Sequence, residues 1–285
     1  MSAAPHSGAT GVETVDLFPG QSRAARRRMA LRDLGEAMTM WRLCWTLSWL
    51  DIRLRYRGSL LGPFWLTLST GVMVGAIGVI YAGLFQQDMH NYLPFVAVSQ
   101  VLWGYLSALV GDGCVGFTSA EGMIRSIRMP FSLYSARAVV RNLLVLGHNV
   151  LVIIVVFAVF GTWPGVHVFL ALPGLVVWLI DSWAVAILLG TLCARFRDIP
   201  PIVGSIMQIA FFATPVIWPP ENLHNHQWVL LYNPFYALLE IVRGPLLGTT
   251  PHQSVYIMAA LTSVVLCGAC WTLFARVRGR IAFWV

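Results

Sequence analysis

The chain has 285 residues, of which 58% are hydrophobic and only 11% are charged, with 19 basic and 12 acidic side chains. About a quarter of the residues of a soluble globular protein are charged, so this supply excludes an ordinary soluble enzyme. The 12 Trp, 15 Phe and 8 Tyr exclude a disordered chain, which would be poor in aromatic and apolar residues. The composition therefore indicates an all-α membrane protein that crosses the bilayer several times.

The basic side chains are all arginine, because the sequence contains no lysine. A Walker A loop uses its lysine to hold the β- and γ-phosphates of a nucleotide, so the chain cannot hydrolyse ATP by that route. No catalytic residue and no cofactor are expected in this chain, and any nucleotide motor would have to be another polypeptide. The five cysteines lie scattered in apolar sequence, which favours small packing residues over a disulfide framework or a metal site. They are Cys44, Cys114, Cys193, Cys267 and Cys270.

The N-terminal part divides into two segments. Residues 1–35 are polar and then basic, and they lack the apolar run and cleavage site of a signal peptide, so they predict a disordered tail. Residues 36–61 predict an amphipathic helix that is too polar to span and lies along the membrane surface. Its broad apolar face is formed by Trp41, Trp45, Trp49, Ile52 and Tyr56. Gly62 and Pro63 end this helix before the apolar sequence begins.

Residues 62–285 predict a transmembrane domain. A helix needs about 20 apolar residues to cross the hydrocarbon core of a bilayer. Six stretches meet this requirement, and an even number places both termini on the same side. They are residues 64–85, 92–110, 135–160, 166–193, 199–218 and 255–275.

The arginines decide which side this is, because basic residues near span ends accumulate in the cytoplasm. Arg243 is the only one of the 19 that falls in a connection on the opposite side from the termini. The sequence therefore predicts that both termini are cytoplasmic.

The connection between the second and third spans, residues 111–130, is long and polar for so apolar a protein. Ser119 is a candidate cap of a short helix, with Glu121 favourable in its first turn and Arg128 in its last. Pro130 would end this helix. A docking helix and a solvated turn both fit these residues.

Four stretches resemble the ABC-2 type permeases. The first resembles the entry to the first span in the polysaccharide-export branch, which serves O-antigen, capsule and teichoic acid. The others resemble the connection after the second span, the family's R-[FY]-R-D-I turn and its external stretch. The four are Asp51 to Trp65, Met123 to Pro130, Arg195-Phe-Arg-Asp-Ile199, and Asn233-Pro-Phe with Glu240 and Arg243. They occur in order over about residues 40–280, although Met129 stands where an aromatic residue is usual.

This resemblance implies half of an exporter in the bacterial inner membrane, with two copies of this chain and two copies of a separate ABC ATPase that holds ATP and Mg²⁺. The implied cargo is a polysaccharide linked to polyprenyl pyrophosphate, the other contacts are membrane lipids, and no nucleic acid partner is expected. The resemblance also implies that residues 118–130 form a coupling helix in a cleft of the ATPase, and that two short external gate helices precede the last span. The residues expected to couple the two subunits are Glu121, Arg125, Arg128, Arg195, Arg197 and Asp198.

Five arginines are expected to form a basic rim at the cytoplasmic leaflet. Guanidinium groups bind phosphate through two parallel hydrogen bonds, so this rim fits either anionic lipid or the pyrophosphate of a lipid-linked glycan. These arginines are Arg53, Arg55, Arg57, Arg137 and Arg141.

Asp181 is the one carboxylate deep in a predicted span, and a charge at that depth must face protein or water. It fits a hydrogen-bonded strut or a gating residue, with His148 and Asn149 as candidate partners. Aromatic residues near span ends suit the membrane interface, and a subset suits the flat faces of sugar rings. The residues expected to line the channel or the gate are Trp65, Trp103, Tyr105, Asp181, Phe211, Phe212, Trp228, Tyr232, Asn233, Glu240 and Arg243. His224 and His226 have no acidic or cysteine neighbours, so they are interpreted as solvated.

Three other functions are alternatives to polysaccharide export. An ABC-2 exporter of a small lipid or drug would share the predicted topology. A membrane-embedded transferase would need acid–base residues that converge on one site, and the sequence carries no G-x-S-x-G or H-E-x-x-H motif. A proton-coupled transporter would need more titratable residues within the spans.

Overall fold

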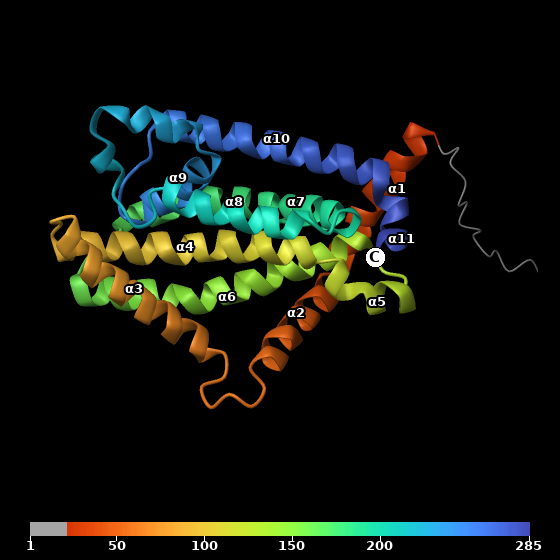
Figure 1. The fold of residues 1–285 in the computed structure, drawn as a ribbon, viewed down its shortest axis with the longest axis horizontal. Helices are drawn as coiled ribbons and strands as arrows, with labels where there is room; N and C mark the ends of the chain where they lie inside the picture. Colours follow the sequence, from red (N-terminus) through yellow and green to blue (C-terminus); the bar gives the residue numbers. More distant parts are fainter. Residues whose placement is uncertain (1–21) are drawn as a thin grey trace, which may run out of the picture.

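The computed structural model describes residues 22–285, without the side chains of residues 224–227, and it is all-helical in this part (Figure 1). Among the described residues, five helices have the length and composition to cross a membrane. They are α3 (Phe64–Leu84), α4 (Met89–Val115), α6 (Phe131–Phe160), α7 (Ala171–Arg195) and α10 (Gln253–Val277). The protein is therefore a multi-pass membrane protein. Residues 1–21 of the predicted tail lie outside the described part.

The sixth predicted span, residues 199–218, is a shorter apolar helix, α8 (Ile199–Ala213). Its 15 residues extend about 22 Å, less than the hydrocarbon thickness of about 30 Å. The helix ends early because Thr214 adopts an extended backbone, and Pro215 follows it.

Several helices continue beyond the apolar stretches that predicted them. Asp112 lies in the last turns of α4 and Arg141 in the first turns of α6, and the two side chains form an ion pair of 2.8 Å. Helix α4 therefore continues past the predicted stretch 92–110, and Asp112 in this extension finds its partner on the neighbouring helix α6. At its other end α6 stops at Gly161, whose φ of +68° is the left-handed conformation of a helix cap.

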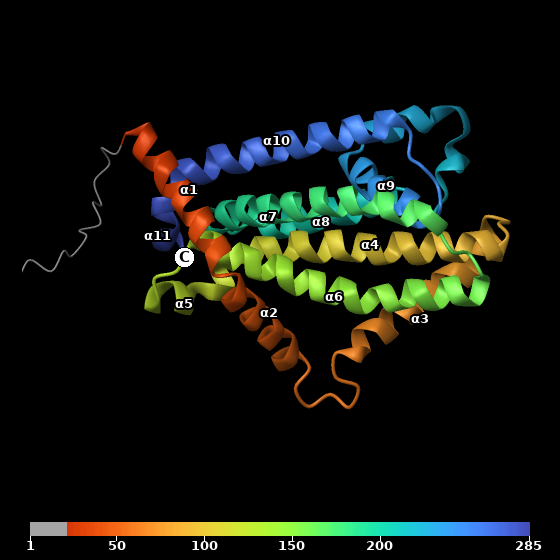
Figure 2. The same ribbon diagram turned by 180° about the vertical axis from the view of Figure 1, so that it is seen from behind.

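Figures 1 and 2 show α4, α6, α7 and α10 running side by side along the length of the molecule. Helices α2 (Trp41–Arg55) and α3 diverge from this bundle as the two arms of a V. One end of the bundle holds α1 (Arg23–Thr39), α5 (Glu121–Ser126), the turn between α7 and α8, η4 (Arg278–Arg280) and α11 (Ile281–Trp284). We call this the arginine-rich end. The opposite end holds η2 (Gly165–Leu170), η3 (Pro220–Tyr232) and α9 (Pro234–Leu246).

The N-terminal segment differs from its prediction. A disordered tail up to residue 35 is wrong for residues 23–35, because α1 begins at Arg23, where Ser22 accepts a hydrogen bond from the backbone N–H of Ala25. The single helix predicted over residues 36–61 is also wrong, since the chain leaves the helix at Met40 and again after Arg55.

Helix α2 packs on α6 through small side chains. Its buried face carries Cys44, Ser48 and Ile52, and the Ser48 hydroxyl donates to the backbone carbonyls of Cys44 and Arg137. Trp41, Trp45 and Trp49 remain exposed, while Ile52, which helical spacing places on the same broad face, is covered by α6. The small residues allow a close approach to α6 and leave the tryptophans facing outward. Burial raises the pKa of the Cys44 thiol, which fits a packing residue.

Asp33 fixes α1 to the rest of the bundle. Its fully buried carboxylate accepts hydrogen bonds from the backbone N–H groups of Phe131 and Ser132, at 3.1 and 2.9 Å, and from the Ser132 hydroxyl. These residues begin α6, where Pro130 supplies no side-chain cap, so Asp33 caps this helix from 98 residues away. Arg278 of η4 donates to the same carboxylate at 2.7 Å. One side chain therefore joins α1, α6 and the C-terminal segment.

We predict that Asp33→Asn lowers the free energy of unfolding by about 3 kcal/mol, because Arg278 loses its partner and the cap of α6 loses its charge. Thermal unfolding of the purified protein in detergent measures this change. Glu36→Gln on the same helix is the matched control, because its ion pair with Arg32 is exposed and contributes less than about 0.5 kcal/mol. Equal stabilities of the two variants would contradict the role of Asp33.

Candidate functional site

The predicted coupling segment forms η1 (Thr118–Ala120) and the short helix α5 at the arginine-rich end. The predicted cap is wrong, because Ser119 lies within η1 and its hydroxyl donates to Gly116 O. Glu121 and Arg125 form an ion pair of 2.7 Å within α5, and Arg125 also donates to the backbone carbonyl of Val285 at 3.1 Å. Arg128 is exposed just beyond α5.

The turn between α7 and α8 lies next to this segment. Glu121 and Arg197 line one cavity of about 300 Å³, together with Trp284 and Val285. The guanidinium group of Arg195 lies 5.6 Å from the centre of the Trp284 ring. The structure therefore brings both predicted coupling segments together around the C-terminal α11, which the sequence analysis did not consider. Asp198 precedes α8 without capping it through its side chain.

The predicted basic rim divides into two groups. Arg137 pairs with Asp51 of α2, with its Nε 2.8 Å from the carboxylate, and Arg141 lies between Asp51 and Asp112. These residues form a half-buried network that ties α2 and α4 to α6, and Asn142 donates to Asp112 at 2.7 Å within it. Two of the five arginines are thus already matched by carboxylates.

The other group stands apart from this network. Arg53, Arg55 and Arg57 are exposed at the end of α2 and in the turn that follows it, near the vertex of the V (Figure 1).

Asp181 lies buried in α7 as a link to α10. It accepts a hydrogen bond of 2.7 Å from the Ser263 hydroxyl, and the Cys267 sulfur lies 4.0 Å away. Of the candidate partners, His148 bonds instead to Leu144 O in its own helix, at 2.7 Å. The geometry supports the interpretation as a strut between two helices.

A groove of about 500 Å³ lies between α4 and α8. Trp103, Phe211 and Phe212 line it, and the Trp103 ring centre lies 5.8 Å from that of Phe211. Tyr105 lies elsewhere, because its ring stacks on Trp178 at 5.5 Å and its hydroxyl is 2.7 Å from that of Ser182. Only some of the predicted channel aromatics therefore share one surface, and Trp65 is exposed on α3.

The segment predicted to form the external gate folds into η3 and α9. Trp228 and Tyr232 are exposed on η3 with their ring centres 6.1 Å apart, edge to face. Asn233 caps α9 by accepting from the backbone N–H of Phe235 at 3.0 Å, and it donates to Thr214 Oγ1 at 2.9 Å. The side chains of His224 and His226 lie outside the described part.

Arg243 connects this gate to the bundle. It is only 1% exposed, it forms an ion pair with Glu240 one turn before it in α9, and it donates to Ser99 of α4 at 3.1 Å and to Pro215 O. The guanidinium carbon also lies 4.9 Å from the centre of the Phe95 ring. One buried side chain thus ties α9, α4 and the segment after α8.

Four residues that take part in these contacts were not predicted from the sequence. Asp33 lay within the predicted tail, Asp112 and Ser99 were undistinguished in or beside apolar stretches, and Trp284 followed the last span. A usable signal existed for Asp33 alone, since it is an acidic residue in a stretch that is otherwise strongly basic.

The fold and these ends define a multi-pass helical membrane protein with a polar, arginine-rich end and a groove between α4 and α8. The ABC-2 type transporter family matches residues 42–247 of the chain. Among curated relatives, the O-antigen export system permease protein RfbA of Myxococcus xanthus is 26% identical over 236 residues, which are 81% of this chain and 91% of that protein. A protein of the same name from Klebsiella pneumoniae is 20% identical over 81% of this chain and 90% of its own length.

The chain therefore belongs to the ABC-2 type transporter family. Members of this family are typically transmembrane permease subunits without catalytic activity. Membership of the family implies an ABC ATPase subunit as partner.

We predict that Arg243→Lys destabilises the protein by about 3 kcal/mol, because a single ammonium group cannot reach Glu240, Ser99 and Pro215 O together. Arg243→Met should cost at least as much, and combining it with Glu240→Gln should restore part of the loss by removing the unpaired carboxylate. Thermal unfolding checks all three variants. An Arg243→Lys protein as stable as the parent would show that the three contacts are not needed together.

Gly174 provides a second test, because α7 meets α9 at this residue. A Cβ atom there would lie 2.9 Å from Ile241 O and 3.1 Å from a methyl group of Val242. Gly174→Ala should therefore cost about 1–3 kcal/mol of stability by separating the two helices. Gly75→Ala in α3 is the control, since its Cβ would meet nothing within 4 Å. Similar unfolding temperatures for both variants would contradict this packing.

Proposed function

We propose that this chain is the permease subunit of an exporter that moves a polysaccharide linked to polyprenyl pyrophosphate out of the cytoplasm. Two copies would form the transmembrane part and two copies of a separate ABC ATPase would supply the energy. The meeting of α5, the α7–α8 turn and α11 around one cavity carries the proposal, because it provides a composite docking surface at one end of the bundle.

The arginine-rich end would face the cytoplasm in this arrangement, with both termini on that side. The positive-inside rule supports this orientation, because arginines gather in α1, α5 and η4 while the opposite end carries the matched Arg243. Helix α8 together with residues 214–218 would complete the sixth crossing. The lysine-free sequence supports a separate motor, since it contains no Walker A lysine.

The groove between α4 and α8 would form half of the conduit, and a second copy of the chain would close it. A long glycan cannot be enclosed in one pocket, so the path must be continuous between two protomers. Trp103, Phe211 and Phe212 support this role because aromatic faces offer flat apolar surface to sugar rings.

The names of the relatives support the choice of cargo, since those proteins are called O-antigen export permeases. The exposed Arg53, Arg55 and Arg57 would meet the pyrophosphate at the membrane surface, because the network of Arg137 and Arg141 is already occupied. An exporter of a small lipid or drug is the second candidate, and it is favoured by the same family match. Under the first proposal alone, cells that lose the protein would accumulate the lipid-linked glycan on the cytoplasmic side of the membrane.

We predict that the charge reversals Arg128→Glu and Arg197→Glu each weaken association with the ATPase at least about tenfold, because both side chains are exposed on the proposed docking surface. Co-purification with a candidate ATPase and stimulation of its ATP turnover in liposomes measure the effect, and glycan export in cells should fall in parallel. Arg28→Glu is the matched control, since Arg28 is exposed on α1 outside the cavity.

Normal assembly and normal ATPase stimulation in both reversals would refute the docking surface. Normal assembly with a glycan pool unchanged by deletion of the gene would instead refute the polysaccharide cargo and leave the docking surface intact.

A further inference from the structure

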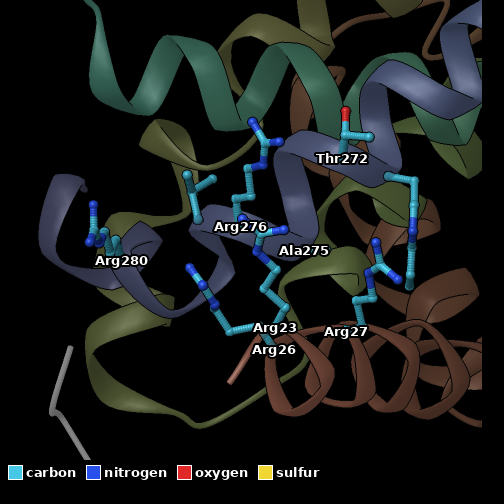
Figure 3. Close-up of a pocket in the computed structure, with 9 residues that line it drawn as sticks. Arg23, Arg26, Arg27, Thr272, Ala275, Arg276 and Arg280 are labelled. Atoms are coloured by element: carbon cyan, nitrogen blue, oxygen red, sulfur yellow. The ribbon is translucent and has the colours of Figure 1, made fainter. Parts of the chain in front are cut away.

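A second polar cavity lies at the arginine-rich end, on the side of α10 (Figure 3). It has a volume of about 500 Å³, and its walls come from the first turns of α1 and from the last turns of α10 with η4. Five arginines and one tryptophan dominate its lining: Arg23, Arg26, Arg27, Arg276, Arg280 and Trp271. It shares no lining residue with the groove between α4 and α8.

The charge of this cavity is not balanced by the protein around it. All five arginines are exposed, and no carboxylate of residues 22–285 forms an ion pair with them. Elsewhere in the described chain, Arg137, Arg141, Arg243 and Arg278 are matched by aspartate or glutamate. Five like charges around one cavity repel each other, so an anion that enters it is attracted by all of them.

The rigid frame of the cavity keeps the arginines together despite this repulsion. The buried Asp33 holds α1 against η4 through Arg278, so the two walls cannot separate freely. The cavity also lies at the N-terminus of α1, where the helix dipole adds positive potential. Guanidinium groups match the geometry of phosphate oxygens, which identifies phosphate as the anion that suits this cavity.

An apolar face of α10 lies beside the cavity. Leu261, Val265 and Thr272 follow each other on one face of α10, at helical spacings that lead into the cavity. Leu261 and Val265 are exposed by 54% and 64%, and Val264 beside them by 70%. Trp271 lines the cavity beside the arginines, and indole rings favour the level of lipid headgroups. The ligand therefore has a phosphate at one end and hydrocarbon at the other.

We propose that this cavity binds the headgroup phosphate of an anionic phospholipid in the leaflet at the arginine-rich end, with the acyl chains along α10. The lipid neutralises the five arginines and fixes α1 to α10 at the membrane surface. This lipid is distinct from the proposed cargo, because the cavity shares no lining residue with the groove between α4 and α8 and its ligand needs no sugar.

The test uses native mass spectrometry of the full-length protein in detergent, titrated separately with dioleoylphosphatidylglycerol, dioleoylphosphatidylcholine and inorganic phosphate. The parent protein should retain phosphatidylglycerol in preference to phosphatidylcholine. Arg23→Gln combined with Arg276→Gln removes one charge from each wall and should weaken phosphatidylglycerol binding about 30-fold. Arg28→Gln combined with Arg42→Gln removes the same charge from exposed sites outside the cavity and should leave binding nearly unchanged.

A second cavity pair, Arg27→Gln with Arg280→Gln, should reproduce the loss and replaces the first pair if that protein fails to fold. Equal losses in the cavity and control variants would overturn the proposal, because they would reflect the total surface charge. Binding of inorganic phosphate that depends on the cavity, with no preference for phosphatidylglycerol over phosphatidylcholine, would also overturn it in favour of a soluble anion.

Discussion

A buried charge must find a partner within the protein, and this constraint organises both ends of the bundle. At the arginine-rich end, Asp33 receives the first backbone N–H groups of α6 and the guanidinium group of Arg278. At the other end, Arg243 forms an ion pair with Glu240 and donates hydrogen bonds to Ser99 and to Pro215 O. Each group joins segments that are far apart in the sequence, so the loops at each end are positioned by one polar centre. The cavity lined by α5, the α7–α8 turn and α11, and the segment of η3 and α9, both depend on this positioning.

Between these ends the bundle is held mainly by apolar packing, with few polar links. The network of Asp51, Arg137, Arg141 and Asp112 lies toward one end, and the bond from Ser263 to Asp181 lies deeper. Such links are directional, so they fix helix rotation more than they add affinity between helices. The face of α8 in the groove carries few of them and presents apolar and aromatic surface. The helices joined by polar links are thus fixed in rotation, whereas the groove face of α8 has few such links.

The sequence predicted the parts of the fold that follow from hydrophobic length. The long apolar stretches became α3, α4, α6, α7 and α10, and the family resemblance was confirmed over residues 42–247. Features that depend on distant partners were not predictable in this way. Asp33 caps a helix 98 residues away, so a local interpretation assigned it to a solvated tail. Arg137 and Arg141 were predicted to meet phosphate because their carboxylate partners lie on other helices. The helix α8 ended early because the backbone turns at Thr214, although the following residues are also apolar.

We propose that the ATPase docks at the end of the bundle that Asp33 organises. Photo-crosslinking tests it most directly, with a benzophenone amino acid placed at Ser126 of α5 or at Thr250 beyond α9, both of which are exposed. The account predicts that the Ser126 probe crosslinks to the co-purified ATPase in membranes and that the Thr250 probe does not. Crosslinking from Thr250 without crosslinking from Ser126 would contradict it.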